Sequence, residues 1–163
     1  MEFYFMFYLL LFLVIIPVSV LIHEIGHGLA VVLFSKMHTR VYLGPTENNH
    51  ENFQIGRMHF HIMWAFYGYC ALGDRESDPT KTQRVINSLA GPLATLLVLL
   101  LTIMFKQYVT SEQLDRILTG VFIYNSYLFL CTIIPFRYPK WWRPYGGMPS
   151  DGYRVYLALK KSA

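Results

Sequence analysis

The sequence predicts a mainly α-helical, polytopic membrane protein with three transmembrane helices and a short strand-containing segment between the first two. Three stretches without charge support this prediction: residues 3–22, 85–105 and 117–135. Each is close to the roughly 20 residues that a helix needs to cross the hydrocarbon core of a bilayer. The composition agrees, since 54% of the 163 residues are hydrophobic and only 15% are charged. We expect a single domain over residues 1–163.

The first span extends beyond its uncharged stretch, because the apolar pattern continues to Phe34. We place this span at residues 3–35, which as a helix would be about 50 Å long, against a hydrocarbon core of roughly 30 Å. The helix must therefore tilt, kink at Pro17 or project from one face. A cleaved signal peptide is not expected, since Glu2 is the only charge before the apolar run and no clear small-residue cleavage site follows it.

Residues 38–73 contain turn signals, β-branched and aromatic residues, and a rough alternation, which together predict two or three short strands. Within them, residues 60–72 are too apolar for a solvated loop and too short to span, which predicts a re-entrant or interfacial segment. The second and third spans follow at residues 82–105 and 117–135. The tail, residues 136–163, begins with aromatic residues and prolines and ends in a short amphipathic run.

The basic residues are distributed unevenly between the two sides of the predicted bundle. Three spans place the first loop and the tail on one side, with twelve of the fourteen lysines and arginines, against Lys106 and Arg116 on the other. This asymmetry predicts a cell-membrane protein with a cytoplasmic first loop and C-terminus and an external N-terminus. Anionic lipid accounts for the basic excess better than nucleic acid does, so no nucleic-acid partner is expected. The twelve residues are Lys36, Arg40, Arg57, Arg75, Lys81, Arg84, Arg137, Lys140, Arg143, Arg154, Lys160 and Lys161.

The stretch "HEIGH" places His23, Glu24 and His27 inside the first apolar run. On a helix, the two histidines lie one turn apart on the same face, so both imidazoles can bind one ion. Glu24 lies about 100° round the helix axis from His23, where it can hold a water molecule and accept its proton. Polar residues are costly in a span, and zinc binding can compensate for that cost. The motif therefore predicts a zinc site.

Spacing alone leaves the third ligand open. Asp151 is the best candidate, because it follows the third span on the side toward which the histidines are displaced, and Gly152 behind it permits a tight turn. Glu47 lies in a turn-rich segment rather than on a second helix. Other candidates lie in the polar linker or in the predicted strands, namely Asp74, Asp78, His59 and His61, and we expect solvated or hydrogen-bonding roles for them.

Four elements in sequence order resemble the site-2 protease (M50) family of intramembrane zinc metalloproteases. They are "HEIGH", the strand-like "RVYLGPTENNHENFQIGRMHFHIMWAFYGYCALG", "NSLAGPLAT" at the start of the second span, and "TIIP…SDG" after the third. The resemblance implies a catalytic core of three helices, zinc held by His23, His27 and Asp151, and Glu24 as general base. It also implies cleavage of a peptide bond in or beside a transmembrane segment of a membrane-associated substrate.

Two positions depart from the family pattern. Thr95 stands where family members commonly have an asparagine, and Thr132 opens what is usually an N-x-x-P motif. Asn87 and Asn125 could supply amide groups in their place, so we regard all four residues as candidates for substrate positioning. The departures also leave open a catalytically inactive zinc-binding scaffold that sequesters a partner. A small channel or transporter subunit is a weaker alternative, because the second and third spans contain few polar residues.

The substrate class follows only in outline. A membrane-tethered regulatory factor precursor and a small peptide precursor both fit, and the bilayer itself is a partner. Since no PDZ-like or CBS-like regulatory domain is evident in the sequence, recognition is expected to depend on the membrane core or on a regulatory membrane partner.

Overall fold

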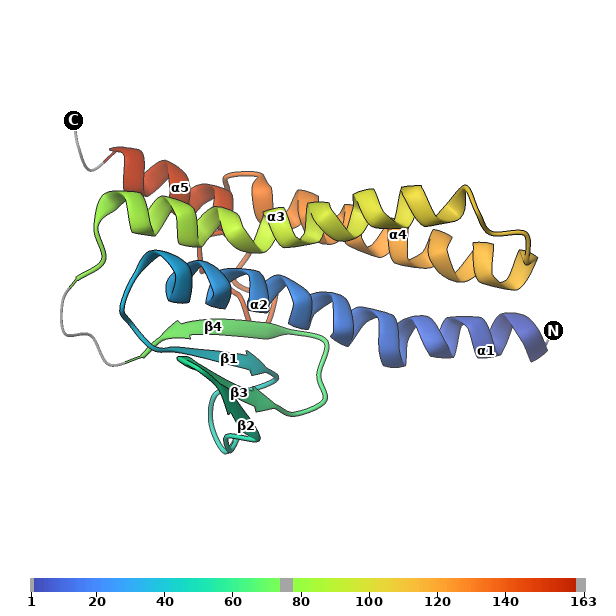
Figure 1. Cartoon of the computed structure of the whole chain (residues 1–163), viewed down its shortest axis with the longest axis horizontal. Helices are drawn as coiled ribbons and strands as arrows, with labels where there is room; N and C mark the ends of the chain where they lie inside the picture. The colour runs from blue at the N-terminus through green and yellow to red at the C-terminus, as the bar shows by residue number, and fades with distance from the viewer. Residues whose placement is uncertain (1, 74–77, 161–163) are drawn as a thin grey trace.

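A computed structural model describes residues 2–73 and 78–160, and it is dominated by long helices that run side by side (Figure 1). The first is continuous over α1 (Glu2–Leu10), a π-helical turn (Leu11–Ile15) and α2 (Ile16–Phe34). Pro17 follows directly after this π-helical turn. A proline inside a continuous helix cannot donate to the carbonyl one turn earlier, and such a site is where the helix departs from regular α-helical bonding.

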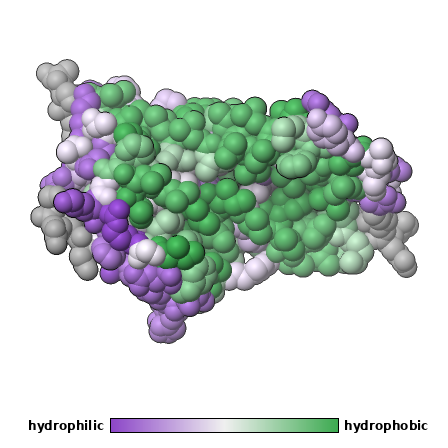
Figure 2. All heavy atoms as spheres, in the orientation of Figure 1, coloured by the Kyte–Doolittle hydropathy of each residue, from purple (hydrophilic) through white to green (hydrophobic). Residues whose placement is uncertain are grey.

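Two further long helices complete the bundle, α3 (Lys81–Lys106) and α4 (Glu112–Ile133). The side chain of Thr80 accepts a hydrogen bond from the Gln83 amide and the Gln83 side chain accepts one from the Thr80 amide, which forms a capping box at the start of α3. All three helical rods are long and apolar enough to cross a membrane. In Figure 2, hydrophobic residues cover the bundle over most of its length, and hydrophilic residues gather at its two ends.

The segment between the first two long helices folds as a four-stranded sheet, so the expectation of two or three strands was too low. Its strands are β1 (Thr39–Leu43), β2 (Phe53–Ile55), β3 (Met58–Ile62) and β4 (Gly68–Leu72), in the order β2-β3-β1-β4. β1 pairs with β3 in parallel and with β4 antiparallel. Most of residues 60–72 lie in the paired strands β3 and β4, and the re-entrant or interfacial location of this segment stays a prediction.

Glycines on α2 let this helix approach its neighbours closely, with the sheet on one side and α3 on the other (Figure 1). A Cβ on Gly28 would lie 2.8 Å from the side chain of Met58, and one on Gly26 would lie 2.6 Å from the carbonyl oxygen of Ala90. The sheet contributes Val41, Met58 and Phe60 to a buried core beneath α2.

The chain returns to the bundle after α4 through residues 134–150 and ends in α5 (Asp151–Lys160). α5 packs against α3 at the end of the molecule where the sheet lies (Figure 1). The start of α5 is thereby brought next to the middle of α2, although the two segments are far apart in sequence.

Candidate metal centre

His23 and His27 lie on one face of α2, and both are buried. Their spacing of four residues places the two imidazoles one helical turn apart on the same face, where the rings meet edge to face and their Nε2 atoms lie 3.2 Å apart. The helix alone thus brings two potential metal ligands together, as the sequence predicts.

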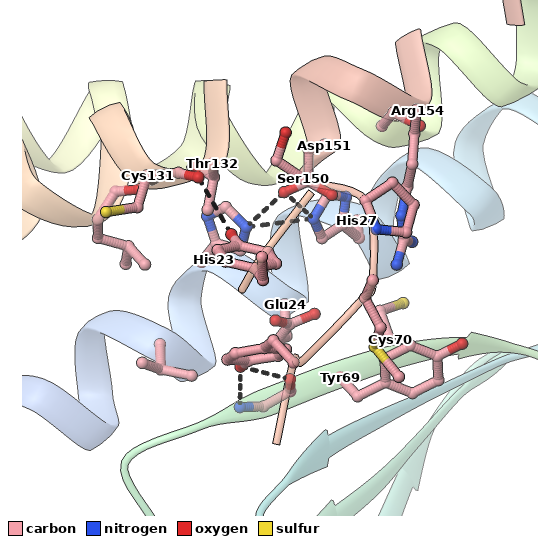
Figure 3. Close-up of a pocket in the computed structure, with 18 of the residues that line it drawn as sticks. His23, Glu24, His27, Tyr69, Cys70, Cys131, Thr132, Ser150, Asp151 and Arg154 are labelled. Atoms are coloured by element: carbon pink, nitrogen blue, oxygen red, sulfur yellow. Dashed lines mark hydrogen bonds and ion pairs between the residues drawn. The ribbon is translucent and has the colours of Figure 1, made fainter. Parts of the chain in front are cut away.

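Asp151 supplies a third group from the first turn of α5. Its Oδ2 atom lies 3.2 Å from Nε2 of His23 and 3.4 Å from Nε2 of His27, as the dashed lines in Figure 3 show. Within the described residues, these three side chains are the one group of histidine, cysteine and acidic residues close enough together to hold a metal ion.

Ser150 and Gly152 fix the position of Asp151. The hydroxyl of Ser150 donates to the carbonyl of Ile134 (2.7 Å) and accepts from the amides of Phe136 and Tyr153 (both 3.2 Å). It therefore caps α5 and also ties this helix to the end of α4. Gly152 is required at the same junction, because a Cβ there would overlap the carbonyl oxygen of Ile133.

The outer nitrogens of both imidazoles are hydrogen-bonded. Nδ1 of His27 lies 2.6 Å from the carbonyl oxygen of Asn87, so it must be the protonated nitrogen. Nδ1 of His23 lies 2.9 Å from Oγ1 of Thr95, and this hydroxyl in turn donates to the carbonyl oxygen of Gly91 (3.2 Å). Both rings are thus held as the tautomer that is protonated on Nδ1, which leaves a free lone pair on Nε2.

This donor set fits a zinc ion. Two nitrogen lone pairs and a carboxylate oxygen face one another at 3.2–3.4 Å, an arrangement that is repulsive without a cation between them. Ligands at about 2.0–2.2 Å from a tetrahedral zinc ion lie roughly 3.3–3.6 Å from one another. The observed separations are close to those of such a set.

Gly91 keeps the space beside these atoms open. A Cβ at this position would collide with Nε2 of His27 and lie 2.7 Å from Nε2 of His23. Any larger residue here would fill the space in which the three ligand atoms converge. The "AGP" element of the sequence therefore has a steric role at the candidate centre.

Glu24 is buried beside the histidines, with its side chain between them and the sheet (Figure 3). It lines a cavity of about 180 Å³ together with His23, His27 and Asp151. Gly68 at the start of β4 allows this approach, since a Cβ there would lie 2.7 Å from Cγ of Glu24. A carboxylate in this position can exchange a proton with a molecule bound in the cavity.

The surroundings of Asp151 favour its charged form. Burial opposes ionisation, but without a cation a proton on His27 and its hydrogen bond to the carboxylate hold the pKa of Asp151 below its usual value. A metal ion would take the place of that proton. Its place in the first turn of α5 acts in the same direction, because the N-terminus of a helix stabilises negative charge. Asp151 is therefore suited to bind a cation.

The four candidates for substrate positioning have different surroundings. Asn87 and Thr132 line the cavity, whereas Thr95 contacts His23. Asn125 is 0% exposed and donates from Nδ2 to Oγ of Ser19 (3.0 Å), which links α4 to α2. It is not among the residues that line the cavity.

The other candidates for a third ligand do not join the two histidines of α2. Glu47 is exposed in the turn after β1. His59 and His61 hydrogen-bond instead to Glu51 (3.0 Å) and to the carbonyl of Asn49 (2.9 Å). Asp78 is not part of the group of potential metal ligands found among the described residues, and Asp74 lies outside those residues.

Several residues around the centre were not among the site residues that the sequence predicts. Gly91 and Ser150 lie inside the motifs "NSLAGPLAT" and "TIIP…SDG", but their roles in close approach and helix capping are seen only in the structure. Tyr145 and Arg154 also line the cavity. They lie in the aromatic tail and on the amphipathic run, where no motif or spacing marks them.

The fold and this site define a class, a membrane protein with a buried His-His-Asp group and a glutamate beside it. The family model for Peptidase family M50 matches residues 11–156, and the chain therefore belongs to this family. The resemblance inferred from the motifs is confirmed. Family M50 is a family of membrane metalloproteases. A comparison with curated proteins finds no match.

Proposed function

We propose that the protein is an intramembrane zinc metalloprotease that hydrolyses a peptide bond in or next to a transmembrane segment of a membrane-associated substrate. The observation that carries this proposal is the convergence of two Nε2 atoms and one carboxylate oxygen at 3.2–3.4 Å, with Glu24 in the same cavity. In our proposal, His23, His27 and Asp151 hold the metal. When bound, zinc would polarise a carbonyl group and make water more acidic.

Glu24 is the proposed general base. Its carboxylate takes a proton from the attacking water and delivers it to the amine that leaves when the peptide bond breaks. Thr95 and the carbonyl of Asn87 keep the imidazoles in the ligand tautomer throughout. The residues of this chain therefore orient the metal ligands and carry one proton from the attacking water to the leaving amine.

A substrate helix must unwind locally before its carbonyl can be attacked, because its carbonyl oxygens are otherwise bonded within the helix. We propose that the unwound stretch is held as an added strand. The strand next to Glu24 is β4, so its edge is the proposed place for this added strand.

The proposed setting is the cell membrane, with the three long helices as spans. The excess of basic residues in the first loop and the tail supports a cytoplasmic location for both and an external N-terminus. Water then reaches the site from the cytoplasmic face. Substrates are regulatory factor precursors or small peptide precursors, recognised within the lipid or through a regulatory membrane partner.

Comparative peptidomics tests this function. Membranes from cells that carry the wild-type protein or Glu24→Gln are compared, with Glu47→Gln, an exposed glutamate in a turn, as the matched control. We expect peptides that depend on the wild-type protein to disappear with Glu24→Gln and to persist with Glu47→Gln, while zinc binding remains in all three. Equal peptide patterns from the wild type and Glu24→Gln would instead support a scaffold that sequesters its partner.

A further inference from the structure

The outer edge of β4 carries backbone groups that face away from the sheet. β4 pairs with β1 along one side, and no other described strand pairs with it. The amide of Gly44 bonds the carbonyl of Tyr67, and the amide of Gly73 bonds the carbonyl of His38. Because these bonds alternate along an antiparallel pair, the N–H and C=O groups of Gly68, Cys70 and Leu72 point outward.

The hydroxyl of Tyr145 occupies the first of these outward positions. It accepts a hydrogen bond from the amide of Gly68 (2.9 Å) and donates one to the carbonyl oxygen of the same residue (2.8 Å). In an antiparallel sheet, a residue of a neighbouring strand makes the same two bonds with its own C=O and N–H. A single side chain of the tail thus replaces one residue of an added strand.

This position lies directly beside Glu24. Gly68 approaches Cγ of Glu24 so closely that a Cβ would lie 2.7 Å from it, and both residues line the same cavity as Tyr145. That cavity measures about 180 Å³, which is smaller than the roughly 300–1,000 Å³ of typical ligand sites. With Tyr145 in place, the amide and carbonyl of Gly68 beside Glu24 are already hydrogen-bonded, so an extended peptide cannot pair with them.

The segment that carries Tyr145 is folded largely on itself. In residues 136–150, the amide of Ser150 bonds the carbonyl of Phe136, the amide of Tyr138 bonds the carbonyl of Met148, and the amide of Gly147 bonds the carbonyl of Tyr138 (all 2.9 Å). The ring of Tyr145 packs on that of Tyr138, with centroids 5.5 Å apart. The side chain of Tyr145 can therefore move away from β4 when its two hydrogen bonds to Gly68 break, while these backbone bonds remain.

We infer that Tyr145 is an intrinsic latch, which holds the strand-binding edge closed at Gly68 and must be displaced by the backbone of an incoming extended peptide. The inference rests on the proposed function, because it concerns access to the same site. The resting protein is therefore self-blocked. Only a segment able to pair with β4 competes with the tyrosine hydroxyl.

Tyr145→Phe tests the latch, since it removes the hydroxyl and keeps the ring. Tyr138→Phe is the matched control: its hydroxyl lies in the same segment and cavity but donates to the carbonyl of Cys131 (3.1 Å) rather than to β4. Hydrogen–deuterium exchange of the full chain in nanodiscs requires neither zinc nor cleavage. We expect the Gly68 amide to exchange about tenfold faster in Tyr145→Phe and at the wild-type rate in Tyr138→Phe. Unchanged exchange in Tyr145→Phe would overturn the latch.

Competition is tested with two zinc-binding probes on the zinc-loaded protein. One is an extended peptide that ends in a hydroxamate, and the other is acetohydroxamate, which has no peptide backbone. We expect Tyr145→Phe to bind the peptide probe about tenfold more tightly and acetohydroxamate unchanged. An equal change for both probes, or weaker binding of the peptide, would contradict the inference. A wild-type protein that binds no zinc would contradict the proposed function, whereas the exchange difference at Gly68 would still decide whether the latch exists.

Discussion

Nδ1 of His23 and Oγ1 of Thr95 lie 2.9 Å apart, although the two residues are 72 positions apart in the chain. The contact joins α2 to α3 at a point where Thr95 is 1% exposed. The threonine hydroxyl donates its own hydrogen bond to the carbonyl of Gly91, so it accepts the one from His23. A residue that departs from the family pattern thus supports the imidazole directly.

Thr95→Val is expected to weaken zinc binding. The valine keeps the shape of threonine but leaves the Nδ1–H group of His23 buried without an acceptor, and loss of such a partner typically costs about 10- to 100-fold in metal affinity. Thr95→Ser restores the hydroxyl and should recover most of that loss. Competition with a fluorescent zinc chelator measures the affinity.

Thr102→Val is the matched control. Thr102 is buried on the same helix and donates only to the carbonyl of Val98, so its change should leave zinc affinity at the wild-type value. Equal loss in both variants would mean that removing any buried hydroxyl from α3 disturbs the site, and would remove Thr95 from the account.

Gly91→Ala is expected to abolish zinc binding while the helices remain. The added methyl group would collide with Nε2 of His27 and crowd Nε2 of His23, so the two rings cannot keep their positions. Circular dichroism and metal analysis together separate loss of the site from loss of the fold. Gly120→Ala is the control, because a Cβ there meets the flexible side chains of Leu11 and Phe7. A Gly91→Ala protein with full zinc content would show that the glycine has no steric role.

Ser150→Ala should weaken zinc binding by a smaller factor. Loss of a helix cap costs about 1 kcal/mol, which corresponds to roughly fivefold in affinity if the cap holds α5 and Asp151 in place. Ser111→Ala is the same change at the start of α4, where the serine side chain makes no capping bond. Isothermal titration with zinc compares the two, and equal affinities would contradict a role for Ser150 in placing Asp151.

The features that the sequence predicts correctly are those set by local geometry. The long helices follow from the length of their uncharged runs, and the pair His23 and His27 follows from the pitch of an α-helix. Neither feature depends on how the rest of the chain folds. The family resemblance adds Asp151, which spacing alone could only rank above the other acidic residues.

Contacts between distant segments explain the rest. The parallel pairing of β1 with β3 and the contact of Tyr145 with Gly68 have no pattern within either segment. Asn125 illustrates the same point, since its bond to Ser19 depends on how α4 packs against α2. Such pairings are set by packing and by the need to satisfy buried polar groups.

The most direct measurement of the central claim is the zinc content of the full chain in lipid nanodiscs. His23, His27 and Asp151 converge, so the wild-type protein should hold about one zinc ion and Asp151→Ala on the order of a tenth of that. Asp115→Ala, which removes a carboxylate that pairs with Lys106 instead, should keep the wild-type content. A metal-free wild-type protein, or full zinc content in Asp151→Ala, would contradict the account.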